Sequence, residues 1–229
     1  MRLILSKTFD IEEHAESLSV YDQKLWIASR EKKILHGFSG GPSAVALQGE
    51  SVTKGFGDSS GGIAWDGNRL IGASAKDRRI FRFDPATGKK EDLIDLATLQ
   101  GGNNTGGLRA SNSEVTDIAW HSGMLWVSVE AGYSSCIIEI DINARRITKD
   151  FWSPGPKPMG LDFDKKSDRL WIIEGRKMEL VDFNSKGEWL GTAAKLPVQA
   201  AHHLSIDDDN NIWTIDAEHS QVHCIRMEE

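Results

Sequence analysis

Two adjacent histidines, His202 and His203, are the most distinctive candidates for chemistry in the sequence. The segment that follows them alternates apolar and polar residues, which is typical of a β-strand. Because successive side chains of a strand point to opposite faces, we expect one of the two imidazoles, and not both, to face a given site. His202 with the carboxylates of Glu16 and Glu114 would suit a divalent cation. The alternative is that these side chains bond only to neighbouring strands and water.

Other familiar catalytic arrangements are missing from the sequence. It contains no phosphate-binding P-loop and no dinucleotide fingerprint. Cys224 follows His223, but neighbours in a strand point apart, so we expect Cys136 and Cys224 to be buried free thiols. The acidic run from Asp207 to Asp209 lacks the spacing of an EF-hand calcium loop, and we expect it to form a turn.

Composition narrows the class of protein. The chain has 229 residues, 39% of them hydrophobic, a net charge of −7 and a mean hydropathy of −0.37, which predicts a soluble globular protein. No apolar run approaches the roughly 20 residues of a membrane-spanning helix, and the first residues do not resemble a secretory signal, so we expect a cytoplasmic protein. The negative charge disfavours nucleic acids and anionic membranes as partners. We expect a monomer without a cofactor, with the divalent cation as the open alternative.

The strands that would position these residues are repeated along the chain. Five segments consist of a short apolar strand, a polar turn and a second apolar strand, and four of the eight tryptophans occupy one place in the second strand. The second strands begin at Leu25, Leu70, Leu125, Leu170 and Ile212. Third and fourth strands follow, separated by turns such as Asp84-Pro85-Ala86-Thr87-Gly88, so each repeat is predicted to be a four-stranded antiparallel meander.

The spacing of the repeats matches the blades of a β-propeller. The second strands are 45, 55, 45 and 42 residues apart, close to the roughly 40 to 50 residues of one blade. The longest interval contains a glycine-rich insertion, Gly101 to Gly107, which we expect to be a mobile surface loop. The last repeat lacks a fourth strand, which Arg2-Leu3-Ile4-Leu5 can supply, and the interval counted through this join is again 42 residues. The sequence therefore predicts an all-β, five-bladed propeller closed by its N-terminal strand.

The predicted propeller forms one domain over residues 1–229. Its blades are expected at about 11–50, 57–96, 112–152, 156–193 and 199–229, the last completed by a strand at 2–9. We expect the repeated tryptophans to fill the wedges between blades rather than to form a ligand cage.

Two family resemblances follow from the aligned strands. The last repeat, from Ala201 to Trp213, resembles blades of NHL-repeat and streptogramin-lyase-like propellers. Residues 61–184 resemble the five-bladed bacterial and plant type of glutaminyl cyclotransferase, in motifs such as Asp66-Gly67-Asn68-Arg69-Leu70-Ile71 and Asp168-Arg169-Leu170-Trp171. The second resemblance implies an enzyme that cyclises an N-terminal glutamine without a catalytic metal.

The catalytic motifs of that family are not retained. Its acid on a second strand falls on Ile27 or, one blade further round, on Thr214. Its Asn-Glu-Leu-Glu run falls on residues 116–119, which keep one shortened acid, Asp117. Its Gly-Lys-x-Trp-Pro motif is reduced to Glu174-Gly175-Arg176-Lys177. The resemblance therefore implies the fold, with Asp117 as the one candidate for catalysis.

Ligands of propellers usually bind at the mouth of the central channel, where the inner strands begin and the loops between second and third strands converge. We expect a polar ring of mixed charge there, able to hold a small zwitterion, a peptide end or a metal ion. The predicted ligand-binding residues are Glu16, Glu114, Asp117, Glu130, Tyr133, Glu174, Arg176, His202, His203 and Asp216.

The sequence favours a protein that binds a small molecule, a peptide or a protein partner at this mouth without turnover. The alternative is an enzyme of the cyclotransferase or lyase type with an altered active site, in which Asp117 would be catalytic. A metal held by Glu16, Glu114 and His202 could assist it.

Overall fold

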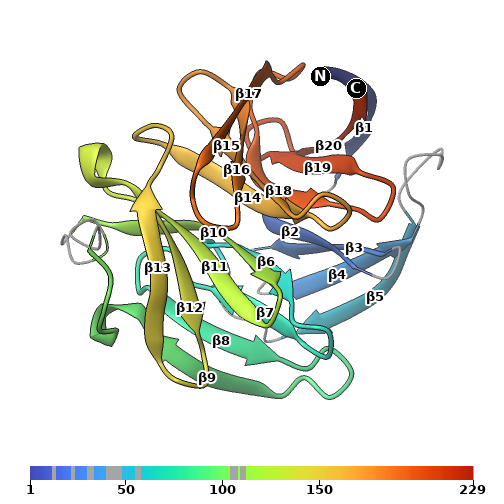
Figure 1. Cartoon of the computed structure of the whole chain (residues 1–229). Helices are drawn as coiled ribbons and strands as arrows, with labels where there is room; N and C mark the ends of the chain where they lie inside the picture. Colours follow the sequence, from blue (N-terminus) through green and yellow to red (C-terminus); the bar gives the residue numbers. More distant parts are fainter. Residues whose placement is uncertain are drawn as a thin grey trace.

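The computed structural model describes residues 1–11, 14–21, 24–29, 34–39, 48–54, 58–103, 108 and 112–228. These residues form five antiparallel sheets of four strands, in which neighbouring strands are hydrogen-bonded. The sheets surround a common axis like the blades of a propeller (Figure 1). The predicted all-β, five-bladed fold is confirmed. Within the described ranges, no helix has the length and apolar character needed to cross a membrane.

The first four blades each begin with their innermost strand. The first contains β2 (Ala15–Tyr21), β3 (Lys24–Ser29), β4 (Ile34–Ser39) and β5 (Gln48–Lys54). The second contains β6 (Ile63–Trp65), β7 (Leu70–Ala73), β8 (Arg79–Phe83) and β9 (Lys90–Asp95). The third contains β10 (Glu114–His121), β11 (Met124–Glu130), β12 (Cys136–Asp141) and β13 (Arg146–Trp152). The fourth contains β14 (Pro158–Asp164), β15 (Arg169–Glu174), β16 (Glu179–Asn184) and β17 (Trp189–Lys195).

The fifth blade is built from both ends of the chain, as the repeat spacing predicted. It contains β18 (His202–Ile206), β19 (Asn211–Asp216), β20 (Gln221–Glu228) and β1 (Arg2–Asp10). β1 pairs antiparallel with β20 from end to end, apart from one bulge at Ser6. Figure 1 shows the two chain ends side by side at this outer edge. Backbone hydrogen bonds therefore close the ring and cover the outer edge of β20.

Apolar side chains between neighbouring blades hold the ring together. The four tryptophans that share one repeat position, Trp26, Trp126, Trp171 and Trp213, are at most 8% exposed. Trp126 of the third blade packs edge to face on Phe163 of the fourth, with ring centroids 5.1 Å apart. Burying a large apolar side chain contributes about 1.5–3 kcal/mol. The tryptophans thus fill the wedges, as the sequence predicted.

Aspartates at the ends of the inner strands fold the turns that follow. One carboxylate oxygen in each of Asp66, Asp164 and Asp207 accepts two backbone N–H groups of the next turn. The other oxygen of Asp207 accepts the indole N–H of Trp213 at 2.9 Å. Some of the aspartates that give the chain its net charge of −7 therefore have a structural role in these Asx turns.

The insertion between the second and third blades is described only in part, because residues 104–107 lie outside the described residues. The segment before it follows the outer strand of the third blade. The backbone N–H of Ile147 donates to the carbonyl of Gln100 at 3.2 Å, and the N–H of Asn103 donates to Asp150 at 2.9 Å. The short 3-10 turn η1 (Leu96–Thr98) precedes this segment.

Candidate functional site

Inner strands of four blades are kinked near their beginning. The pairing of β2, β10, β14 and β18 with the following strand shifts its register there. The residues skipped in this pairing are Glu16, Thr116, Met159, and His203 with Leu204. A bulge interrupts the regular alternation of side chains and bends the strand. This local feature therefore helps to decide which side chains reach the mouth of the channel.

A pocket of about 230 Å³ opens at this end of the channel, and we call it the mouth pocket. Four of the predicted site residues line it, namely Glu114, Glu130, His202 and His203. Both histidines line the pocket, whereas the alternation of a regular strand predicts that one of them does. The bulge in β18 explains the difference, because it removes the strict alternation between these two positions.

The other residues that line the mouth pocket belong to the second, third and fourth blades. They are Asp58, Ser60, Ala75, Lys76, Val115, Thr116, Lys157 and Met159. Thr116 and Met159 could have been found from the sequence, because they occupy the same repeat position as Glu16 and His202. Asp58 precedes the first strand of its blade, where the repeat carries no such signal.

Two predicted site residues, Glu174 and Asp216, are buried at the ends of β15 and β19 and fold the next turn. Oε2 of Glu174 accepts the backbone N–H of Lys177 at 2.8 Å. Oδ1 of Asp216 accepts the N–H groups of Glu218 and His219. Burial would raise the pKa of Asp216, but hydrogen bonds from the side chain and backbone of His219 outweigh it, and the net shift is downward. These carboxylates therefore already have structural partners.

Three further predicted residues do not line the pocket formed by the described residues. Tyr133, in the 3-10 turn η2 (Gly132–Ser134), is 96% exposed. Arg176 is exposed in the turn after β15, and Glu16 is partly buried at the bulge of β2. A ligand confined to the mouth pocket would not need these three side chains.

Asp117 lies beneath the mouth pocket and joins three blades. Its Oδ2 accepts the backbone N–H groups of Leu161, at 3.0 Å, and Leu204, at 2.9 Å. Its Oδ1 lies 3.0 Å from Nδ1 of His203. Burial raises the pKa of Asp117, while His203 and the two backbone N–H groups oppose that rise. We call Asp117 and His203 the dyad.

The mouth pocket shows no complete metal site. Within the described ranges, no group of three or more His, Cys, Asp or Glu side chains is arranged to hold a metal ion. Of the three candidate ligands, Glu114 and His202 line the pocket and Glu16 does not. Burial, together with the nearby His203 and Lys157, lowers the pKa of His202, so this imidazole is neutral at pH 7.

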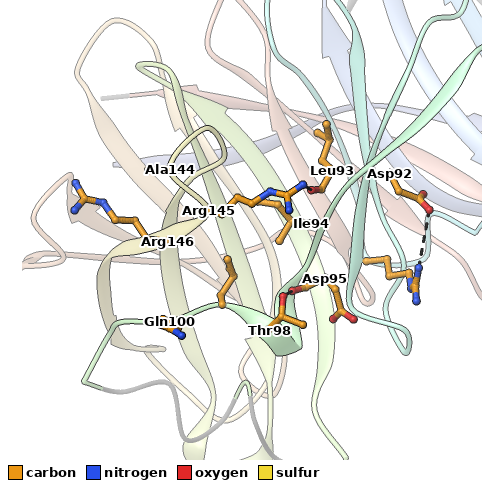
Figure 2. Close-up of a pocket in the computed structure, with 11 residues that line it drawn as sticks. Asp92, Leu93, Ile94, Asp95, Thr98, Gln100, Ala144, Arg145 and Arg146 are labelled. Carbon is orange, nitrogen blue, oxygen red and sulfur yellow. Dashed lines mark hydrogen bonds and ion pairs between the residues drawn. The ribbon is translucent and has the colours of Figure 1, made fainter.

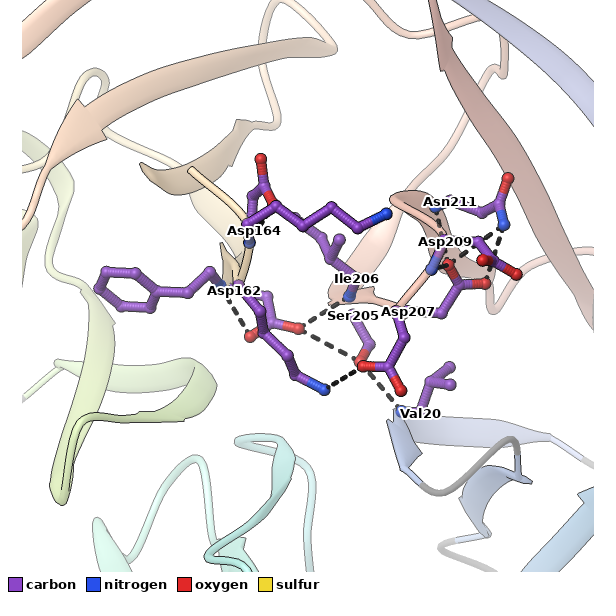
Figure 3. Close-up of polar contacts among 12 residues, drawn as sticks. Val20, Asp162, Asp164, Ser205, Ile206, Asp207, Asp209 and Asn211 are labelled. Carbon is purple, nitrogen blue, oxygen red and sulfur yellow. Dashed lines mark hydrogen bonds and ion pairs between the residues drawn. The ribbon is translucent and has the colours of Figure 1, made fainter. Parts of the chain in front are cut away.

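The channel has a second pocket, of about 250 Å³, at the other ends of the inner strands, and we call it the far pocket. Figure 3 shows Asp162 there, bound to the backbone N–H of Ile206 at 2.8 Å and to the hydroxyl of Ser205 at 3.3 Å. Burial raises the pKa of Asp162 to about 7, although the N–H groups of Ile206 and Phe163 oppose the rise. The two pockets share no lining residue in the described part of the chain.

A groove of about 550 Å³ lies outside the channel, between the second and third blades (Figure 2). Arg145 reaches across it and donates to the carbonyl of Leu93 at 3.3 Å. Within the second blade, the guanidinium of Arg79 is 3.9 Å from the carboxylate of Asp92. Because Arg145 contacts both walls, we interpret the groove as a contact between blades.

Comparison with known proteins supports the fold and goes no further. No family model and no curated protein sequence matches the chain. Glutaminyl cyclase from Myxococcus xanthus has a TM-score of 0.61 and 9% identity, over 98% of this chain and 95% of that chain. A chain of the mitotic checkpoint complex has a TM-score of 0.53 and 14% identity, over 94% of this chain and 62% of that chain. The WD40 propeller domain of Doa1 has a TM-score of 0.52 and 11% identity, over 99% of this chain and 98% of that chain. At such identities the similarity shows the β-propeller fold alone.

Proposed function

We propose that the protein binds a small zwitterionic ligand, a free amino acid or the end of a peptide, in the mouth pocket. One observation carries the proposal: Glu114 and Glu130 line the same 230 Å³ pocket as Lys76 and Lys157. Carboxylates hold an ammonium group and lysines hold a carboxylate, both through charge-assisted hydrogen bonds. Pockets for drug-sized ligands measure roughly 300–1,000 Å³, so this pocket suits a smaller molecule.

The histidines of the pocket suit the same ligand. His202 is neutral at pH 7, because burial is the largest of the effects that lower its pKa. A neutral imidazole offers one donor and one acceptor and adds no charge to the balance between carboxylates and lysines. With Asp58, the pocket has three carboxylates and two lysines, so both charges of a zwitterion find a partner there.

Calorimetric titration with alanine and with alanyl-alanine tests the proposal. We expect both to bind, and we expect N-acetyl-alanine and alanine amide to bind at least about tenfold more weakly, because each lacks one charge. Glu130→Gln and Lys157→Gln should each weaken the binding of alanine by a similar factor. Glu91→Gln and Lys186→Gln, which change exposed charges away from the pocket, are matched controls. Equal affinity for alanine and its two analogues would refute the proposal.

A cyclotransferase-like enzyme is the second candidate, and the fold similarity to glutaminyl cyclase supports it. Both oxygens of Asp117, its candidate acid, already accept hydrogen bonds, which disfavours a direct role in moving a proton of a glutaminyl substrate. We can distinguish the binding protein from the enzyme by incubating the protein with glutaminyl peptides and measuring the ammonia released. Ammonia release that is lost in Asp117→Asn would replace the binding proposal with this one.

A further inference from the structure

The dyad has the arrangement of a histidine held ready for proton transfer. Asp117 binds Nδ1 of His203 and leaves the other ring nitrogen, Nε2, to the pocket side of the pair; a ring that donates from Nδ1 has its lone pair on Nε2. Among the described residues we find no hydrogen bond to Nε2, and His203 lines the mouth pocket. His203 thus lines the place where the ligand is proposed to bind and keeps one ring nitrogen without a hydrogen bond from the described residues.

The backbone of His203 is in an unusual conformation for a strand. Its φ is +59°, in the left-handed region. The other described non-glycine residues with positive φ, such as Met178 and Ser220, lie between strands, whereas His203 lies inside β18. Such a conformation is unfavourable and persists only where surrounding contacts hold it, often at functional sites. In β18 it accompanies the contact between His203 and Asp117.

Two glycines in neighbouring blades leave room for the dyad. A Cβ atom on Gly62, whose φ is +105°, would lie 2.5 Å from Oδ1 of Asp117. A Cβ atom on Gly160 would lie 2.8 Å from the backbone carbon of His203. Gly62, Asp117, Gly160 and His203 occupy the same repeat position in four blades, directly before the buried residues Ile63, Ile118, Leu161 and Leu204. The ring therefore combines the two polar side chains with two positions that have none.

Charged groups around the dyad suit a reaction at a carbonyl group. Lys157 is close enough to His202 to help lower its pKa, which places a positive charge on the histidine side of the pocket. A cation there can stabilise the negative charge that develops on a carbonyl oxygen during attack by water. Glu114 and Glu130 can hold an ammonium group of the same molecule.

We propose that the mouth pocket hydrolyses small esters of amino acids, with His203 as the general base and Asp117 as the residue that positions it. Nε2 of His203 takes a proton from a water molecule while the water oxygen attacks the ester carbonyl. When the bond to the alcohol oxygen breaks, His203 returns the proton to that oxygen. One water and one ester are consumed, and one amino acid and one alcohol are formed. The inference rests on the proposed function, because the same pocket must hold the amino-acid part.

Hydrolysis of alanine methyl ester, followed by proton NMR and corrected for the rate in buffer, tests the inference. We expect His203→Gln to lower kcat/KM on the order of 10²- to 10⁴-fold, the usual contribution of a general base. Asp117→Asn should lower the rate and also move the apparent pKa of the pH–rate profile downward, because no carboxylate then stabilises the imidazolium. A purely structural role of Asp117 would leave that apparent pKa unchanged and would overturn its assignment.

The chain offers a matched control in a second Asp–His pair. Nδ1 of His219 lies 2.8 Å from Asp216, but the His219 side chain is 59% exposed and does not line the mouth pocket formed by the described residues. His219→Gln should keep the wild-type rate. An equal rate for wild type and His203→Gln would overturn the inference. Binding of alanine without ester hydrolysis would also overturn it while leaving the proposed function intact, and loss of both would overturn both.

A labelling experiment on the wild-type protein covers the case in which His203→Gln fails to fold. The chloromethyl ketone of alanine alkylates an accessible imidazole nitrogen, with loss of chloride, when the reagent binds beside it. We expect mass spectrometry to find the label on His203 and free alanine to slow the labelling. Labelling of His219 instead, or no labelling of His203, would overturn the inference.

Discussion

Leu3 lies directly opposite Met227 in the sheet that joins the first strand of the chain to the last. Both side chains pack against the apolar core between the fourth and fifth blades. Phe9, at the other end of β1, stacks on Trp213 with ring centroids 6.0 Å apart. The N-terminal strand thus contributes to the core as well as to the backbone pairing that closes the ring.

Deletion of residues 1–8 should lower the melting temperature sharply and cause aggregation. The deletion exposes the edge of β20 and removes the half-buried side chains of Leu3 and Ile4. Each contributes part of the roughly 1.5–3 kcal/mol of a fully buried side chain, against the roughly 5–15 kcal/mol of a domain. Circular dichroism and light scattering measure the two effects. Leu5→Ala is the control, since Leu5 is 39% exposed and its loss should change little. If the truncated protein had the melting temperature of the wild type, the role of β1 in closing the ring would be contradicted.

Asp162→Asn should change how stability depends on pH. The folded-state pKa of about 7 lies above the ordinary value of 3.8, so the folded protein keeps a proton that the unfolded chain releases. The stabilisation from this proton is fully present below pH 3.8 and is lost as the pH rises through about 7. Because asparagine does not titrate, the stability of the variant relative to wild type should rise across this window, by up to about 1.4 kcal/mol per pH unit.

Urea unfolding of wild type and Asp162→Asn at several pH values between 4 and 7 measures this difference. The substitution also disturbs the hydrogen bonds to Ile206 and Ser205, but that cost does not depend on pH. A difference in unfolding free energy that stays constant across the window would refute the raised pKa.

Asp207→Ala and Asp208→Ala should differ strongly although the residues are adjacent. Asp207 accepts the indole N–H of Trp213 and backbone N–H groups of its turn, so its loss leaves a buried donor without a partner and costs about 1–3 kcal/mol. Asp208 forms an exposed ion pair with Lys165, worth about 0–1 kcal/mol. Urea unfolding should show a larger loss of unfolding free energy for Asp207→Ala than for Asp208→Ala. Equal losses would contradict the role of Asp207.

Cys136 and Cys224 should resist thiol reagents in the native protein. Both side chains are fully buried, and burial raises the pKa of each thiol to about 12, so the reactive thiolate is scarce. A colorimetric thiol reagent at pH 8 should react slowly with native protein and rapidly after addition of guanidinium chloride. Rapid native reaction would mean that the wedges containing these residues open readily.

The sequence alone determined the architecture of this protein, because the signals for it are local and repeated. The recurrent Leu-Trp position, the alternation of the inner strands and aspartates such as Asp207 at the turns each act within a few residues. Their constant spacing then predicts the number of blades, and the missing fourth strand of the last repeat predicts the role of Arg2 to Leu5. Part of the mouth pocket, including Glu114 and Glu130, follows from the same alignment.

Only the tertiary structure decided which polar groups meet in the channel. Asp117 contacts Leu161, Leu204 and His203 because the ring brings three blades within hydrogen-bond distance, and no local pattern encodes that approach. The bulge in β18 brings both histidines to the pocket, against the alternation of a regular strand. A repeat fixes what each blade contains. Contacts between blades depend on small backbone shifts and on the space at residues such as Gly62, which become defined only when the ring closes.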